Sequence, residues 1–103
     1  MAKVIEKDGV LTLKLSALEK IGALHGDISV AGNQLLAKTE VPNPWTRKHL
    51  RGFRAPGTGF PFLIMLGTMR FKGGKDFCAI YKRTPAVIYE FTDAPFQRWV
   101  VSI

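Results

Sequence analysis

The sequence predicts a mainly β domain with one short helix, and three features lead to this prediction. Apolar residues alternate with polar ones along several short segments, which is the period of a strand with one buried face. Dipeptides that favour turns, such as Asp8-Gly9 and Gly73-Gly74, separate these segments. Hydrophobic residues make up 47% of the 103 residues, enough to bury a core, so we expect a single domain spanning residues 1–103.

The N-terminal residues predict a β-hairpin followed by a short helix. Two extended segments, Val4 to Asp8 and residues 11–15 with leucine at every second position, flank the Asp8-Gly9 turn. Ser16 and Glu19 then have the spacing of a capping box, in which each side chain binds the other residue's backbone N–H at a helix start. We expect the helix at about residues 17–24, with Leu18, Ile21 and Leu24 as its buried stripe.

The middle of the chain predicts two strands and then a long loop. Asp27 to Val30 is a candidate strand, and residues 35–41 alternate as a half-buried strand that the Pro42-Asn43-Pro44 sequence ends. Periodicity is absent from Trp45 to Pro61, apart from a short extended piece around residues 50–54. We therefore expect a long loop there, and loops of this length in compact domains are often functional.

The C-terminal half predicts a meander of four antiparallel strands. The segments are residues 63–71, 76–81, 85–91 and 96–103, and a hairpin turn at Lys72-Gly73-Gly74-Lys75 joins the first two. Strands at about ten-residue spacing are typical of a sandwich or a barrel.

Positive charge is concentrated in one third of the chain. The net charge is +7, and residues 41–75 contain seven lysines and arginines but neither aspartate nor glutamate. The other residues contain eight basic and eight acidic side chains, which cancel. Segregated charge of this kind creates a local positive potential that attracts anions.

The stretch from Trp45 to Arg54 interleaves aromatic and basic residues, and three interpretations remain open for it. The stretch is a solvated loop with its aromatic residues packed inward, a surface that docks on anionic lipid, or a contact to nucleic acid. We do not expect the nucleic-acid contact, because the recognition motifs of nucleic-acid-binding proteins are missing. The Gly57-Thr58-Gly59 sequence either packs closely or offers backbone N–H groups to an anion. The candidate anion- or partner-binding residues are Trp45, Arg47, Lys48, Arg51, Arg54, Thr58 and Arg70.

Several motifs of the chain resemble a known family. They are Arg51 to Pro61, Leu66-Gly67-Thr68, Lys75-Asp76-Phe77, Pro85 to Ile88, and Phe96 to Val101. With these motifs the chain resembles small bacterial proteins related to the pleckstrin-homology-like (PH-like) domains. The resemblance implies a bent antiparallel sandwich or partly open barrel of about seven strands, capped by a C-terminal helix. No activity comes with it, since this fold serves lipids, peptides and proteins alike.

The chain departs from the resemblance at its end, because Ile103 closes a predicted strand. We therefore expect the C-terminal capping helix to be absent or truncated. The helix near residues 17–24 or a second subunit then covers the barrel mouth, or the mouth stays open.

Catalytic and metal-binding patterns are sparse. His25 and His49 lack a metal-ligand spacing, so we expect no metal and no cofactor, and His25 suits the end of the short helix. We expect Cys78 to be a small core residue and Asp76 to make a structural hydrogen bond to the hairpin or to a loop arginine. The sequence therefore predicts a binding protein and not an enzyme.

The leading hypothesis is a PH-like interaction module that binds an acidic partner through its basic loop. The partner is a protein or a second copy of the chain, with an anionic lipid surface as a further option. Two alternatives stay open: a carrier of a small apolar ligand, and an enzyme with a site at Arg54, Thr58 and Asp76. The carrier would hold its ligand between Phe60, Phe62, Met65 and Met69.

Location follows from what the sequence lacks. The apolar stretch from Phe60 to Leu66 is too short to span a bilayer, and the first residues contain no apolar core of a signal peptide. With one cysteine, the chain cannot form an internal disulfide, which fits a reducing compartment. We expect the protein to be cytoplasmic and without a transmembrane segment.

Overall fold

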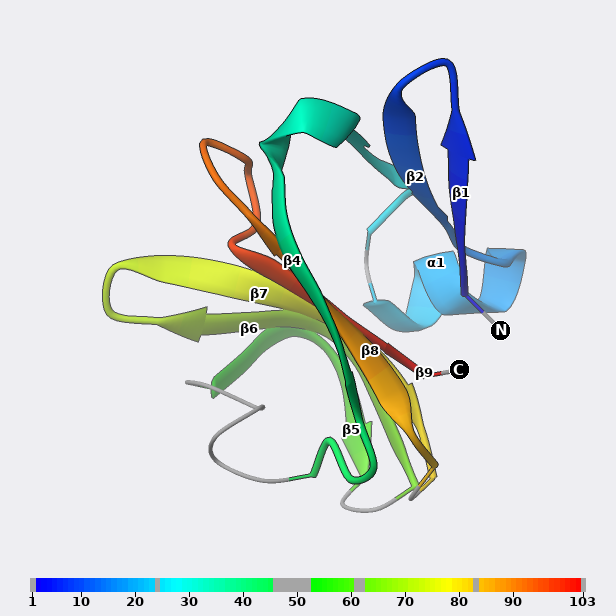
Figure 1. Cartoon of the computed structure of the whole chain (residues 1–103). Helices are drawn as coiled ribbons and strands as arrows, with labels where there is room; N and C mark the ends of the chain where they lie inside the picture. The colour runs from blue at the N-terminus through cyan, green and yellow to red at the C-terminus, as the bar shows by residue number, and fades with distance from the viewer. Residues whose placement is uncertain (1, 24, 46–52, 61–62, 83, 103) are drawn as a thin grey trace.

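The computed structural model describes residues 2–23, 25–45, 53–60, 63–82 and 84–102. The chain forms a mainly β structure of two sheets with one short α-helix beside them (Figure 1). Neither sheet closes into a barrel within these residues. The mainly β class and the single short helix predicted from the sequence are thus confirmed.

The smaller sheet contains three strands whose order in space is their order in the chain. These are β1 (Lys3–Lys7), β2 (Val10–Lys14) and β3 (Ile28–Ala31), and both pairings are antiparallel. Asp8 and Gly9 form the β1–β2 turn with φ values of 53° and 76°. Two consecutive positive φ angles match the twist of a two-residue hairpin, so the predicted hairpin is confirmed.

The larger sheet has six strands in the order β4-β8-β9-β7-β6-β5. A 3₁₀ turn, η1 (Gly32–Gln34), leads into the first of them. The strands are β4 (Leu35–Val41), β5 (Phe53–Phe60), β6 (Ile64–Phe71), β7 (Gly74–Tyr81), β8 (Ala86–Phe91) and β9 (Arg98–Ser102). The described strands outnumber the roughly seven that the family resemblance implies.

The predicted four-stranded antiparallel meander is wrong in its order. The β6–β7 and β8–β9 pairs form as expected, but β9 lies between β7 and β8 and runs parallel to β7. All five residues of β9 are buried. A strand buried on both faces gains most from a central position, and this outweighs the short connection between β7 and β8.

The predicted loop from Trp45 to Pro61 is wrong over its second part, because residues 53–60 form the edge strand β5. Its pairing with β6 shifts between Arg54 and Gly57, which marks a β-bulge. Glycine and proline at the bulge hide the alternation by which a strand is recognised in a sequence. The first part of the expected loop, residues 46–52, lies outside the described residues.

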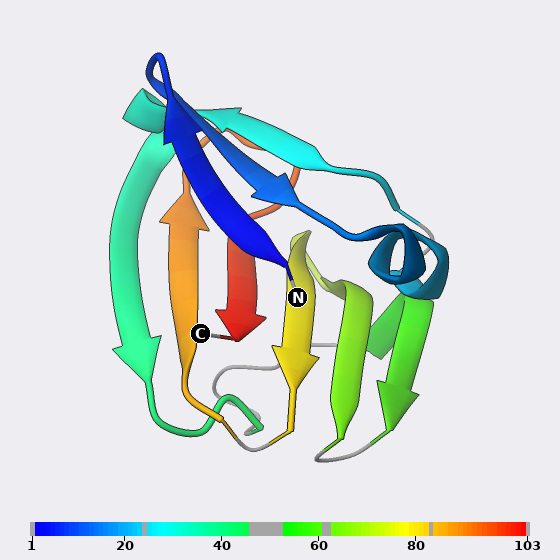
Figure 2. The same cartoon turned by 90° about the vertical axis from the view of Figure 1, so that its right-hand side faces the viewer.

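Two hydrophobic clusters use opposite faces of the larger sheet. The first joins Phe77, Trp99 and their neighbours on one face to the smaller sheet and to Ala23 of the helix. The second contains Cys78, Ile80 and Val100 on the other face, with Trp45 packed against it. Figure 2 shows the smaller sheet and the helix on one side of the larger sheet. Cys78 is therefore a buried core residue, as predicted.

The helix α1 (Ala17–Ala23) begins at the predicted capping box. The Ser16 N–H donates to Glu19 Oε1 at 2.8 Å, and the Glu19 N–H donates to Ser16 Oγ at 3.2 Å. The predicted buried stripe is wrong, because Leu18 and Ile21 are 81% and 70% exposed while Glu19 is only 3% exposed. The remaining member of that stripe, Leu24, lies outside the described residues.

Glu19 faces inward because the larger sheet offers it a partner. The Tyr81 hydroxyl at the end of β7 donates a hydrogen bond to Glu19 Oε2. Burial alone raises the pKa of Glu19, but the hydrogen bonds from Ser16 and Tyr81 outweigh it and leave this pKa below its usual value. The same burial and the neighbouring carboxylate raise the pKa of Tyr81.

Candidate functional site

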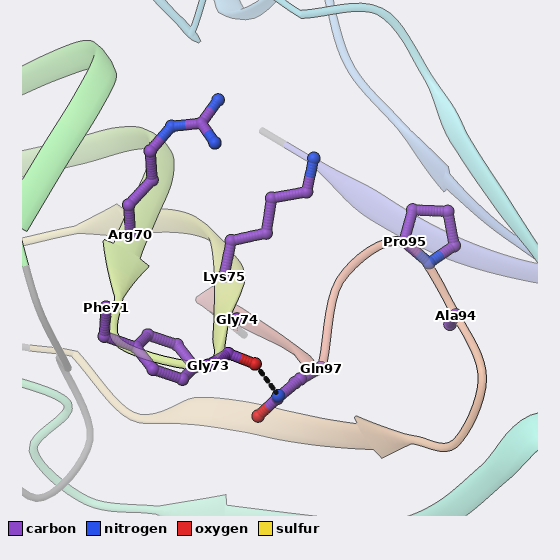
Figure 3. Close-up of a pocket in the computed structure, with 8 residues that line it drawn as sticks. All are labelled: Arg70, Phe71, Gly73, Gly74, Lys75, Ala94, Pro95 and Gln97. Atoms are coloured by element: carbon purple, nitrogen blue, oxygen red, sulfur yellow. Dashed lines mark hydrogen bonds between the residues drawn. The ribbon is translucent and has the colours of Figure 1, made fainter.

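The candidate site is an open pocket of about 500 Å³ at the turn end of the β6–β7 hairpin. One wall is the hairpin itself, and the other is the segment that leads into β9 (Figure 3). We call it the basic pocket, because two of its eight lining residues are basic and none is acidic. They are Arg70, Phe71, Gly73, Gly74, Lys75, Ala94, Pro95 and Gln97.

The two basic side chains come from neighbouring strands at paired positions. Arg70 of β6 lies directly opposite Lys75 of β7, and their side chains extend on the same side of the hairpin (Figure 3). Lys75 Nζ lies 4.8 Å from the centroid of the Phe96 ring, a cation–π contact that steadies the ammonium group. Two positive charges on neighbouring strands favour the binding of anions in this pocket.

Gln97 joins the two walls of the basic pocket. Its Nε2 donates to the Gly73 carbonyl at 3.0 Å, and its backbone N–H donates to the Lys75 carbonyl at 2.8 Å. The turn itself consists of Lys72 and Gly73, since Phe71 pairs with Gly74, and Gly73 has a φ of 98°. A hairpin forms here as predicted, but its two turn residues are Lys72 and Gly73 and not Gly73 and Gly74, and Gln97 fixes its position.

Gly74 leaves the room in which the Gln97 side chain lies. A Cβ atom at position 74 would stand 2.4 Å from Gln97 Nε2, so any other residue there would displace the amide. The pocket walls are thus tied together by contacts that a bound ligand does not have to form.

The acidic residue next to the basic pocket is neutralised elsewhere. Asp76 follows Lys75 but is fully buried, and its Oδ2 accepts hydrogen bonds from Arg98 Nε at 3.1 Å and from the terminal Nη2 at 3.0 Å. The structural hydrogen bond predicted for Asp76 is thus present, with an arginine of β9 and not of a loop. The charge of Asp76 is therefore balanced within the sheet and leaves the potential at Arg70 and Lys75 positive.

Of the candidate residues predicted from the sequence, Arg70 lines the basic pocket and Trp45 does not. Trp45 is half-buried against the second hydrophobic cluster, and its Nε1 donates to the Lys82 carbonyl at 2.6 Å. For Arg54 and Thr58 the structure gives backbone positions in β5, opposite Met69 and Leu66. The other three candidates, Arg47, Lys48 and Arg51, lie outside the described residues.

The backbone register separates the residues of the alternative enzyme site. Arg54 and Asp76 both lie opposite Met69, on its two sides, whereas Thr58 lies opposite Leu66. Met69 and Leu66 belong to the two different hydrophobic clusters, which occupy opposite faces of the sheet. Within the described part of the chain, no group of three or more potential metal ligands comes together.

The residues proposed for an apolar carrier are only partly described. Met69 is buried and Met65 half-buried in the second hydrophobic cluster, while the Phe60 side chain and Phe62 lie outside what the structure describes.

His25 contacts aromatic rings just beyond the helix. It is half-buried, and its ring lies edge-on to Phe77 and Phe96, with 5.5 Å between centroids in each case. Its Nδ1 donates to the Gly26 carbonyl at 2.8 Å.

Comparison with protein-family models, curated proteins and solved structures found no match for this chain. The basic pocket is therefore interpreted from its own residues. A separate search of the described helices found none with the length and hydropathy needed to cross a bilayer.

Sequence reasoning missed two important residues of the basic pocket, Lys75 and Gln97. Lys75 was missed because the predicted turn at Gly73 and Gly74 pairs it with Lys72, whereas the observed turn at Lys72 and Gly73 pairs it with Arg70. Gln97 was missed because it reaches the hairpin only when β9 inserts beside β7, and the sequence does not show which two strands β9 lies between.

Proposed function

We propose that this protein is a binding module for an anionic partner, which it engages through the basic pocket. The observation that carries the proposal is the paired projection of Arg70 and Lys75 into a pocket without acidic lining. Arginine offers a planar fork of N–H donors and lysine a compact charge, and together they suit a phosphate or carboxylate group.

Pre-organisation supports the same proposal. The Gln97 contacts to Gly73 and Lys75 hold both walls before a ligand arrives, and Phe96 restrains the lysine. Binding therefore loses little conformational entropy at these side chains.

We further propose that the fold is PH-like, as the sequence motifs suggest. Two packed sheets with open edges support this, while the parallel β7–β9 pair departs from a purely antiparallel sandwich. In such a scaffold, loops at the ends of strands bind while the sheets provide rigidity. An experimental structure that superposes on PH-like domains over both sheets would establish the family.

The binding proposal is tested by titrating the ¹⁵N-labelled protein with three probes. These are inorganic phosphate, a hexaglutamate peptide, and phosphatidylcholine vesicles with and without phosphatidylserine. We expect at least one probe to shift or broaden the N–H signals of Gly73, Gly74 and Gln97, and added salt to weaken its binding. The double variant Arg70→Gln/Lys75→Gln should lose about tenfold or more in affinity, because each charge-assisted hydrogen bond contributes about 1.5–3 kcal/mol.

A matched control separates the basic pocket from net charge. The variant Lys3→Gln/Lys7→Gln loses the same two charges from exposed positions of β1 and should bind like the wild type. Equal losses in both variants, or pocket signals that stay unmoved by all three probes, would refute the proposal. The probe that binds identifies the chemistry of the partner.

A further inference from the structure

The edge strand β4 carries two opposite charges, Lys38 and Glu40, close together on the exposed part of the strand. Among the described strands β4 pairs with β8 alone and forms an outer edge of the larger sheet (Figure 2). An edge strand of this kind can pair with a strand of another chain. Lys38, Thr39 and Glu40 are exposed at its centre. Neither Lys38 nor Glu40 forms an ion pair with another residue in the described part of the chain.

The register with β8 places these two charges on one face of the sheet. Lys38 lies opposite Tyr89 and Glu40 opposite Val87, whereas Thr39 lies opposite Ile88 on the other face. Lys38 Nζ lies 5.5 Å from the centroid of the Tyr89 ring, which holds the lysine over its own sheet.

A second copy of the chain would offer each of these charges an ion-pair partner. If β4 pairs antiparallel with β4 of another copy about a two-fold axis through Thr39, Lys38 of each copy lies opposite Glu40 of the other. Directly opposite residues in such a ladder have Cβ atoms about 4.5–5.5 Å apart, close enough for both ion pairs to form. The axis is perpendicular to the sheet, so both copies keep their smaller sheets on the same side.

The charges also select this register over its neighbours. Moving the axis to Lys38 would set two lysines opposite each other, and moving it to Glu40 would set two glutamates opposite each other. Like charges at opposite positions are unfavourable. Shifting the register by a single position would set Lys38 of one copy opposite Thr39 of the other, lose both ion pairs and turn the smaller sheets of the two copies to opposite sides.

The outer edge of β1 lacks this complementarity. A two-fold axis through its central residue, Ile5, would set Lys3 opposite Lys7. Lysines on an exposed edge are a common protection against strand pairing. The two sheets thus differ in that one edge repels its own copy and the other matches it.

We propose that this protein forms a symmetric dimer in which the β4 strands of two copies pair about Thr39 and join the larger sheets. The ladder runs from Ala37 to Val41, because the register shift next to Leu36 and the proline at position 42 limit it. One short strand pair buries less than a standard interface, so we expect a weak dimer that dissociates on dilution. This dimer is independent of the basic pocket, whose residues lie on other strands.

Disulfide trapping tests the position of the axis. Opposite residues in an antiparallel pair have Cα atoms about 4.5–5.5 Å apart, which suits a disulfide. Under mild oxidation Thr39→Cys should form a covalent dimer, while Ile5→Cys, exposed at the centre of the β1 edge, should remain monomeric. Equal rates of crosslinking for the two variants would overturn the proposal.

A charge swap tests the pairing without crosslinking. Sedimentation equilibrium up to about 1 mM protein should detect the wild-type dimer. Lys38→Glu and Glu40→Lys each create two like-charged pairs, and each should weaken association by about tenfold. The double variant Lys38→Glu/Glu40→Lys restores both pairs at unchanged net charge and should regain the wild-type affinity. A wild type that stays monomeric throughout, or a double variant as weak as the singles, would overturn the dimer.

Discussion

The two sheets of this protein are stabilised in different ways. The smaller sheet pairs strands that are neighbours in the chain, and most residues of its edge strand β1 are exposed. The larger sheet joins strands far apart in the chain, buries its central strands β7 and β9 on both faces, and encloses an ion pair between them. The smaller sheet thus combines one tight turn, at Asp8 and Gly9, with packing of β2 and β3 onto the larger sheet, whereas the larger sheet depends on strand pairs formed between distant parts of the chain. Mutations at the centre of the larger sheet should therefore be the most damaging.

The largest expected effect follows from removing Arg98. Its side chain is buried and donates two hydrogen bonds to the carboxylate of Asp76, which is fully buried. Arg98→Met takes away this counter-charge, and breaking a buried ion pair costs about 3–5 kcal/mol. We expect urea unfolding to show a loss of that size in the free energy of unfolding.

The double variant Asp76→Leu/Arg98→Met is the control. With both charges gone no carboxylate has to be kept in the interior, so the double variant should be more stable than Arg98→Met alone. A double variant that loses the sum of two independent effects would show that the pair is not coupled.

The second prediction concerns the contact between the helix and the larger sheet. Glu19 accepts hydrogen bonds from the Ser16 N–H and from the Tyr81 hydroxyl. Glu19→Ala leaves both donors without this acceptor, at a cost of about 1–3 kcal/mol. Glu19→Gln keeps a side-chain oxygen and the capping-box geometry, so it should lose less. Thermal unfolding of the two variants measures the difference, and equal losses would contradict the proposed role of the hydrogen bonds.

The same contact predicts a pH dependence. The pKa of Glu19 is lowered on folding from its ordinary value of 4.5, so its contribution is present above that pH and is lost as the pH falls. The pKa of Tyr81 is raised from 10.0, so its contribution is present below pH 10 and is lost as the pH rises further. Glu19→Ala should flatten the acid limb of stability against pH, and Tyr81→Phe the alkaline limb. If both variants show the same dependence of stability on pH as the wild type, the proposed coupling of these two groups to folding is refuted.

The sequence predicts the parts of the fold that depend on local chemistry. Asp8 and Gly9 adopt the positive φ angles of their turn, and Ser16 and Glu19 form the capping box, because these geometries need only adjacent residues. The buried face of the helix, predicted from the spacing of its apolar residues, was wrong. The carboxylate of Glu19 is buried and hydrogen-bonded, while Leu18 and Ile21 are exposed. Hydrophobicity alone cannot anticipate Glu19 facing inward, because its partner Tyr81 is 62 residues away.

Strand order could not be predicted from the turns. The short connection between β7 and β8 predicts a hairpin, yet β9 lies between the two strands. One signal was available, since Trp99-Val100-Val101 is a continuous apolar run of the kind that central strands contain. For the candidate site, charge segregation indicated Arg70, but its opposition to Lys75 and the bridging by Gln97 arise from tertiary structure.

The smallest effect is expected at the surface beside the smaller sheet. Asp27 Oδ1 accepts a hydrogen bond from the Leu15 N–H at 2.8 Å, and Lys14 Nζ lies 3.1 Å from Oδ2. The hydrogen bond from Leu15, followed by that from Lys14, lowers the pKa of Asp27, so its contribution is present above the ordinary value of 3.8 and is lost below it. Asp27→Asn keeps an oxygen for Leu15 and loses only the exposed ion pair, and solvent and salt screen such pairs. Asp27→Asn should therefore lower the Tm by less than Glu19→Ala does. The difference in Tm between Asp27→Asn and the wild type should become smaller in high salt. A loss as large as that of Arg98→Met would mean that the smaller sheet also depends on a central electrostatic contact, and the contrast between the two sheets would no longer hold.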